Sequence, residues 1–137
     1  MKAFWLFVLL AAPLHLWSQN ILEVQVEGVE SSDGLIQVAL FTSRDGFLKT
    51  TGAYRTDSVK ALKGTTRLLL DNLPPGTYAL ALFHDKNENL KLDTNWIGIP
   101  KEPMGFSNAR MKTFGPPSFE ECRVDFRENG TISIRLE

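Results

Sequence analysis

Cysteine, histidine and excess basic charge are all scarce in this chain. A single cysteine, Cys122, stands in 137 residues, which excludes an intramolecular disulfide. The chain has 15 lysines and arginines and 16 aspartates and glutamates, so its net charge is close to zero. A near-neutral surface does not suit a nucleic-acid partner, whose phosphates need a basic surface. Helical periodicity of useful length is also missing, so the core is not expected to rest on helices.

The longest apolar run lies at the N-terminus. It follows Lys2, extends over residues 3–14 with one interruption at Pro13, and ends near the small residue Ser18. This arrangement predicts a secretory signal peptide over residues 1–18, cleaved near 18/19. A membrane anchor or a first strand of the domain is the alternative, but the run is short for a bilayer and no second run follows, so no membrane span is expected after its removal. We therefore expect an exported protein, whether periplasmic, cell-surface or secreted.

Period-two alternation of apolar and polar residues fills the remaining domain, residues 19–137. The alternating stretches are 21–28, 34–41, 65–73, 77–85, 121–127 and 131–137. The stretch 77–85 is apolar on both faces, which is typical of a central strand, and Cys122 falls on the apolar face of 121–127. Asn129-Gly130 favours a tight hairpin between the last two strands. Residues 58–62 fit either a helical turn or an edge strand.

The strand count defines the expected fold. Six to seven strands predict an all-β, antiparallel β-sandwich of immunoglobulin-like or prealbumin-like type, with a small β-barrel as the alternative. Residues 85–118 form one long loop, which we expect to be ordered and packed across one end of the sandwich because it carries too much apolar surface to leave in water. Its apolar residues are Trp96, Ile97, Ile99, Met104, Phe106, Phe114 and Phe119.

The segment "HDKNENLKLDTN", residues 84–95, carries oxygen-bearing side chains at alternate positions. A twelve-residue calcium loop counted from Asp85 takes Asp85, Asn87, Asn89, the Lys91 carbonyl and Asp93 as ligands at positions 1, 3, 5, 7 and 9. Position 6 is a leucine instead of glycine, and position 12 is a tryptophan instead of a carboxylate. With two formal charges the site is expected to be weak, with a Kd of roughly 10⁻⁴–10⁻³ M. The competing interpretation is a polar turn in which Asp and Asn bond their own backbone.

Five motifs of this region, in order, resemble an uncharacterised family of exported bacterial proteins, domain-of-unknown-function family 2141. They are "GTYALALFHD" (76–85), "KLDTN" (91–95), "GIPKE" (98–102), "GFSN" (105–108) and "FGPPSF" (114–119). The resemblance covers residues 34–136 and implies an exported β-sandwich without assigning an activity. The family's loop usually reads Asn-Gly-Asn-Gly, whereas this chain has Glu88 and Leu90 at the glycine positions. A non-glycine residue must then accept the strained turn.

The resemblance suggests that the long loop is a defining feature of the architecture. Candidate ligand-binding residues from it are Asn95, Trp96, Glu102, Ser107 and Asn108, together with Gly98 and Pro100. In the competing interpretation these residues only fix the conformation of the loop.

The sequence is compatible with three functions. The leading hypothesis is a non-enzymatic exported module that binds a small ligand, a carbohydrate or a protein partner through the long loop, with calcium as its only candidate cofactor. Exposed Trp96 and Phe106 would suit stacking on sugars or covering apolar groups. The alternative is a small hydrolase that uses His84, the only histidine of the mature domain, with Asp85 or Asp93. The third is a structural subunit that adds the strand "TISIRLE" to a partner, although charged edges oppose such pairing.

Overall fold

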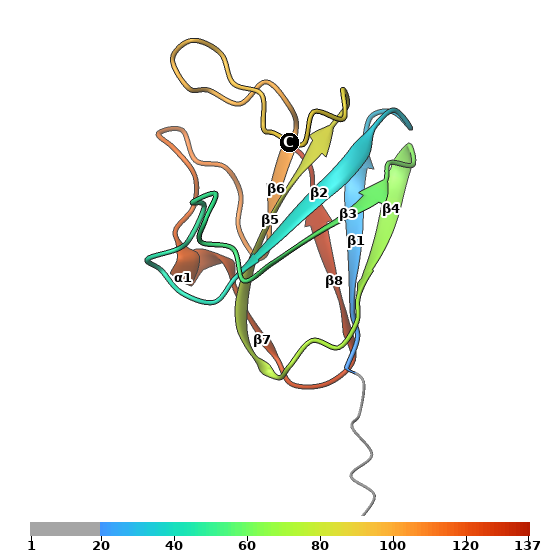
Figure 1. The fold of residues 1–137 in the computed structure, drawn as a ribbon, viewed down its shortest axis with the longest axis vertical. Helices are drawn as coiled ribbons and strands as arrows, with labels where there is room; N and C mark the ends of the chain where they lie inside the picture. The colour runs from blue at the N-terminus through green and yellow to red at the C-terminus, as the bar shows by residue number, and fades with distance from the viewer. Residues whose placement is uncertain (1–19) are drawn as a thin grey trace, which may run out of the picture.

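The computed structural model describes residues 20–137 as eight strands and one short helix, so the predicted signal peptide lies outside the described residues. Two open sheets face each other (Figure 1). The elements are β1 (Leu22–Val29), β2 (Leu35–Phe41), β3 (Arg55–Lys60), β4 (Gly64–Leu70), β5 (Gly76–Asp85), β6 (Met104–Phe106), α1 (Phe119–Cys122), β7 (Arg123–Phe126) and β8 (Gly130–Arg135).

The first sheet has the order β4-β1-β8, and the second has the order β3-β2-β5-β6 with β7 also paired to β5. The predicted all-β sandwich is confirmed. The sequence predicts a helical turn or an edge strand at residues 58–62, and the structure has the edge strand β3 at residues 55–60. The expected six to seven strands become eight within residues 20–137, because β6 is a three-residue strand inside the long loop. One pair departs from the antiparallel prediction, since β1 and β8 run parallel.

The main core lies between the two sheets. Most of it comes from the inward-facing residues of the alternating strands. These are Leu22, Val24, Val26, Ile36, Val38, Leu40, Leu68, Leu70, Tyr78, Leu80, Leu82 and Ile134. Burial of each such side chain is worth roughly 1.5–3 kcal/mol. Within the described part of the chain, the residues of both core clusters lie between Leu22 and Leu136.

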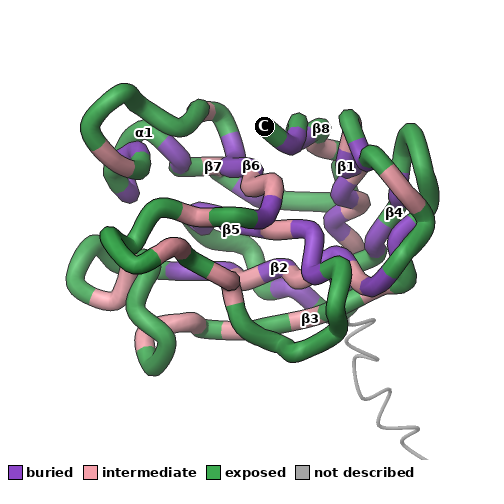
Figure 2. The backbone as a smooth tube through the Cα atoms, turned by 90° about the horizontal axis from the view of Figure 1, so that it is seen from above, coloured by how far each residue is buried: buried purple, intermediate pink, exposed green. Residues whose placement is uncertain are grey.

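A second cluster covers the outer face of β5. Ala79 and Ala81 pack there against Phe41, Phe106 and Phe119. This cover explains why β5 is buried on both faces, as its continuous apolar sequence predicts. The exposed residues lie mostly in the loops that extend from the sheets (Figure 2).

Two local predictions at the C-terminal strands are wrong. Asn129-Gly130 does not form a hairpin: neither residue has positive φ, and β7 pairs with β5 while β8 pairs with β1 in the other sheet. The turn therefore carries the chain from one sheet to the other. Cys122 is not in a strand but ends α1, where the capping box of Ser118 and Glu121 starts a helical turn, and it packs into the second cluster.

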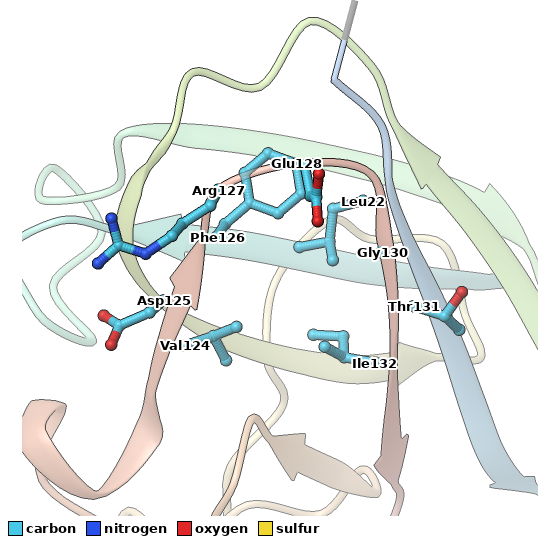
Figure 3. Close-up of a pocket in the computed structure, with 9 residues that line it drawn as sticks. All are labelled: Leu22, Val124, Asp125, Phe126, Arg127, Glu128, Gly130, Thr131 and Ile132. Atoms are coloured by element: carbon cyan, nitrogen blue, oxygen red, sulfur yellow. The ribbon is translucent and has the colours of Figure 1, made fainter.

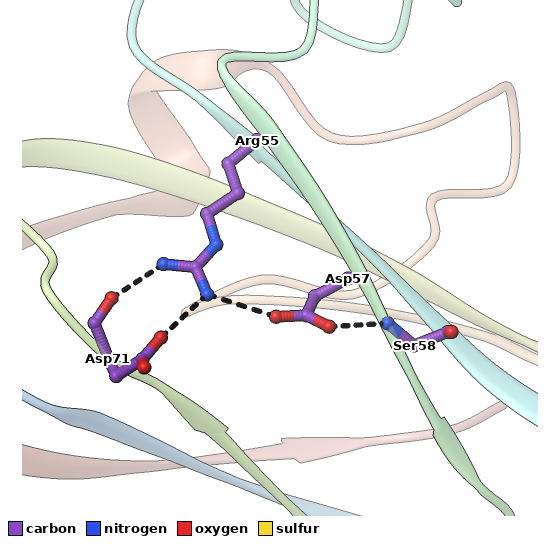
Figure 4. A network of polar contacts seen from close by, with 4 residues as sticks. All are labelled: Arg55, Asp57, Ser58 and Asp71. Atoms are coloured by element: carbon purple, nitrogen blue, oxygen red, sulfur yellow. Dashed lines mark hydrogen bonds and ion pairs between the residues drawn. The ribbon is translucent and has the colours of Figure 1, made fainter.

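An arginine network joins the two sheets at one edge (Figure 4). Arg55 on β3 donates to the Asp71 carbonyl at 2.6 Å, just after β4, and its other nitrogen reaches the carboxylates of Asp57 and Asp71 at 3.0 and 3.1 Å. Asp57 in turn accepts from the Ser58 amide at 2.9 Å. These bonds tie β3 of one sheet to the end of β4 in the other.

Candidate functional site

The segment that follows β5 folds around the carboxylate of Asp85. Asp85 is fully buried and accepts hydrogen bonds from the amides of Asn89 at 3.1 Å and Leu90 at 2.9 Å. The Gln37 side chain from β2 donates a third bond at 3.2 Å. A buried carboxylate needs such donors because burial removes its water. Asp85 therefore organises the loop that begins with it.

The loop turns sharply at two non-glycine residues. Glu88 has φ 56° and Leu90 has φ 63°, both in the left-handed region. These are the two positions at which the resembling family usually carries glycine. The sequence prediction that Leu90 must accept the strained turn agrees with this geometry. Side chains other than glycine pay about 1–2 kcal/mol there.

Three further side chains of the loop converge. Asn87 and Asn89 each donate their amide nitrogen to Asp93, both at 2.8 Å. The amide oxygen of Asn87 accepts from the backbone of Asn89 at 3.3 Å, and that of Asn89 accepts from Lys91 at 3.0 Å. An amide oxygen has two lone pairs, so each keeps one for another partner.

Glu102 closes the loop at its base. It is 9% exposed, and its two carboxylate oxygens accept from the amides of Lys86 at 3.3 Å and Asp93 at 3.0 Å. These two amides stand at the beginning and the end of the loop. Glu102, a candidate ligand-binding residue, thus holds the loop together.

The ligands predicted for calcium are the carboxylates of Asp85 and Asp93, the amide oxygens of Asn87 and Asn89, and the Lys91 carbonyl. In the structure Asn87 and Asn89 turn their amide nitrogens toward Asp93, and their amide oxygens accept from backbone amides. Carboxylate, amide and carbonyl oxygens are the ligands that calcium takes. Among residues 20–137 no three His, Cys, Asp or Glu side chains gather as a metal cluster, so any cation would depend on the amides. The same hydrogen bonds also suffice for a polar turn.

The residues after the loop form a tip that protrudes beyond the sheets, at the upper left of Figure 1. A bridge between Thr94 and Pro100 closes it. Trp96 is 95% exposed at this tip, beside Ile97 at 56% and Ile99 at 54%. The expectation that the apolar residues of the long loop pack across the sandwich is wrong for these three and for Phe114, which is fully exposed. Phe106 and Phe119 are buried, as packing of the loop predicts, and the burial of Phe106 overturns its suggested role in stacking on a ligand.

Asn95 fixes the backbone of the tip. Its side-chain oxygen accepts from the amides of Ile97 at 3.1 Å and Ile99 at 2.9 Å. Its own amide donates to the Ile99 carbonyl at 2.8 Å, and its carbonyl accepts from Gly98 at 3.0 Å. Asn95 therefore stabilises the conformation of the loop, in which the Trp96 side chain is exposed to solvent.

Two other candidate ligand-binding residues hold the chain internally. Ser107 is buried, and its hydroxyl donates to the Cys122 carbonyl at 2.5 Å and accepts from the Leu80 amide at 2.9 Å. Asn108 is exposed, has φ 55°, and donates to the Arg123 carbonyl at 2.6 Å. Both contacts tie the long loop to the strands that it crosses.

His84 lies inside the sandwich and is fully buried. Its Nε2 lies 2.7 Å from the Asp33 carbonyl, which can only accept, so Nε2 carries the proton. Its Nδ1 is buried without a hydrogen-bond partner in the described part of the chain. A hydrolase would need His84 in an open cleft beside Ser or carboxylate, and this environment does not provide one.

A shallow cleft of about 300 Å³ opens at the other end of the sandwich, between the edge strands β7 and β8 (Figure 3). Val124 and Ile132 lie between the two strands, and Asp125, Arg127 and Glu128 stand around them. None of the predicted site residues lines this cleft.

Sequence reasoning missed two residues that support the Asp85 loop. Gln37 reads as an outward residue of an alternating strand, and nothing in its own sequence context signals a bond to Asp85. Gly34 has φ 70°, and a Cβ there would lie 2.0 Å from the Asp85 carbonyl oxygen. Only glycine allows β2 to start so close to the end of β5.

Comparison with known proteins gives one match. A family model described as an uncharacterized protein conserved in bacteria (DUF2141) matches residues 24–134, from β1 to β8. No curated protein and no protein of solved structure matches the chain.

Proposed function

The chain belongs to the DUF2141 family of uncharacterized proteins conserved in bacteria, and from this premise we propose that it is an exported, non-enzymatic binding module. Its β-sandwich supports the loop at residues 85–93, which binds calcium weakly and orders the adjoining tip at residues 94–100. The tip presents Trp96 to a partner.

The solvent exposure of Trp96 carries this proposal. A tryptophan 95% exposed on a loop with a bonded backbone is unusual, because a large aromatic side chain gains free energy from burial. The side chain of Asn95 holds the loop in this conformation by accepting two backbone hydrogen bonds. Such an arrangement favours a role in contact with something outside the chain.

Calcium enters the proposal through the donor set at residues 85–93. The amide oxygens of Asn87 and Asn89 each accept one backbone hydrogen bond and keep a second lone pair, while their amide nitrogens donate to Asp93. Asp85 holds the first turn in place from a buried position. Lys101 donates its amide to the Asp93 carbonyl at 2.8 Å, so an ordered Asp93 also orders the base of the tip.

Thermal unfolding of the chain from residue 19 tests the calcium part. At 10 mM calcium and a Kd of roughly 10⁻⁴–10⁻³ M, binding to the folded state alone adds about 1.4–2.7 kcal/mol and raises Tm by several degrees over chelator. Asp93→Asn, which keeps the size of the side chain, should remove the shift. An equal Tm with calcium and with chelator would reduce residues 85–93 to a polar turn.

Quenching of Trp96 fluorescence tests the surface part. After removal of residues 1–18 Trp96 is the only tryptophan, since the other two are Trp5 and Trp17. Acrylamide should quench the folded chain nearly as well as the chain in urea. Much weaker quenching in the folded chain would show that Trp96 is covered, and the module would lose its proposed binding surface.

A further inference from the structure

The tip at residues 94–100 combines exposed apolar side chains with a complete lack of charge. Trp96, Ile97 and Ile99 are all exposed, and "TNWIGIP" contains no ionisable residue. Its single polar amide side chain, Asn95, is engaged with the backbone of the tip. The surface that the tip offers is therefore largely apolar, and the Thr94 hydroxyl at its base is its one exposed polar side chain.

Four backbone amides of the tip are also satisfied internally. The amides of Asn95, Ile97, Gly98 and Ile99 all donate hydrogen bonds within the tip. An amide without a partner is costly wherever water is excluded. This loop can enter a low-dielectric environment without leaving those four donors unpaired.

Two lysines stand at the base of the tip. Lys91 and Lys101 are exposed, and neither forms an ion pair within residues 20–137. Lys86 and Lys112, by contrast, pair with Glu30 and Glu121 at 2.7 Å each. Glu102, the neighbour of Lys101, is buried and bonded to two amides, and Asp93, the carboxylate nearest in sequence to Lys91, accepts from the side chains of Asn87 and Asn89. The apolar tip is thus bordered by ammonium groups that lack a carboxylate.

We propose that the tip docks on an anionic lipid bilayer. Trp96, Ile97 and Ile99 enter the interface, and the ammonium groups of Lys91 and Lys101 contact the phosphate headgroups. A stable protein interface takes about 20 residues a side, far more than a protruding tip of three apolar side chains supplies. The inference rests on the proposed function, since it names the partner of the Trp96 surface.

Vesicle binding tests this inference with the chain from residue 19, because the apolar residues 3–14 would themselves bind lipid. Vesicles of equal parts phosphatidylcholine and phosphatidylglycerol should shift Trp96 emission to shorter wavelength and carry the protein into the pellet. Lys91→Glu with Lys101→Glu should weaken the partition by roughly 30-fold or more. Ile97→Ser with Ile99→Ser should weaken it at least tenfold while retaining Trp96 as the reporter.

The matched control is Leu62→Ser with Leu69→Ser. Both leucines are 57% exposed, close to the exposure of the two isoleucines, and Leu69 lies on β4 in the other sheet. This control should bind as the unaltered chain does. Absence of pelleting and of a Trp96 shift would overturn the inference, and so would equal losses in the isoleucine and leucine pairs or unchanged binding after lysine reversal.

The calcium and acrylamide measurements separate failure of this inference from failure of the proposed function. A calcium-dependent Tm and an accessible Trp96 without vesicle binding would leave a binding module whose partner is not lipid. Vesicle binding without a calcium effect would keep the lipid surface and remove the metal. A covered Trp96 would remove both proposals.

Discussion

The buried carboxylate of Asp85 accepts a hydrogen bond of 2.9 Å from the amide of Leu90, a residue held at φ 63°. The bond anchors the residue that carries the strain, because a leucine in the left-handed region is unfavourable and the hydrogen bond to Asp85 holds its backbone in place. The loop is therefore stable in spite of its sequence at position 90, and the donors around Asp85 supply the compensation.

Leu90→Gly should stabilise the domain. Glycine removes the left-handed penalty of about 1–2 kcal/mol, while its greater freedom in the unfolded chain returns roughly 0.5–1 kcal/mol. Leu90 is 70% exposed, so little buried surface is lost. We expect the unfolding free energy to rise by up to about 1 kcal/mol in urea denaturation. Lys91→Gly, where φ is not positive, is the matched control and should destabilise.

Asp85→Ala should be among the most damaging substitutions in the loop. It would remove a buried acceptor that the Leu90 amide and the Gln37 side chain share, and would leave the Asn89 amide with only its longer bond to Asn87. We expect a loss of about 3 kcal/mol of unfolding free energy. Asp93→Asn alters partly exposed bonds and should cost under about 1 kcal/mol. Equal effects of the two variants in urea denaturation would contradict this account.

Much of the fold could be predicted from the sequence because period-two alternation directly records which residues face the core. The buried residues Leu22, Val24 and Val26 on β1 follow their alternation without exception. The partners of β7 and β8 could not be read in this way. Asn129-Gly130 is a hairpin signal by local propensity, but β7 completes the sheet of β5 and β8 completes that of β1, so tertiary pairing overrides the local preference.

The candidate site could be predicted in part. The alternating Asp and Asn residues of 85–93 predict either a calcium loop or a polar turn whose side chains bond their own backbone, and the structure contains such backbone bonds at Asn87 and Asn89. The exposure of Trp96 could not be predicted, because apolar composition argues for burial and says nothing about a loop whose backbone is held by Asn95. Gln37 escaped notice since its bond spans 48 residues and depends on the pairing of β2 with β5.

Acid should weaken the capping box of α1 through Glu121. The Lys112 ammonium, followed by the Ser118 amide and hydroxyl, lowers the pKa of this carboxyl from 4.5 to about 2. A depressed folded-state pKa gives stability that is present above pH 4.5 and is lost as the pH falls through about 2. Glu121→Gln should therefore lower Tm at pH 7 and leave it unchanged below pH 2. Glu128→Gln, outside any ion pair within residues 20–137, should give no such difference.

Cys122 should be unreactive in the folded protein and should report on the opening of α1. Burial, with a smaller contribution from the Glu121 charge, raises the pKa of its thiol from 9.0 to about 11. At pH 8 the folded chain then holds little thiolate, which is the reactive form. A disulfide reagent at pH 8 should label the chain readily in urea and very slowly without it, and Cys122→Ser provides the blank because no other cysteine exists.

A labelling rate that rises in step with global unfolding would show that α1 opens only with the sandwich. A rate that does not depend on low urea concentrations would show local opening of α1, and rapid labelling without urea would contradict the burial of Cys122 in the second cluster.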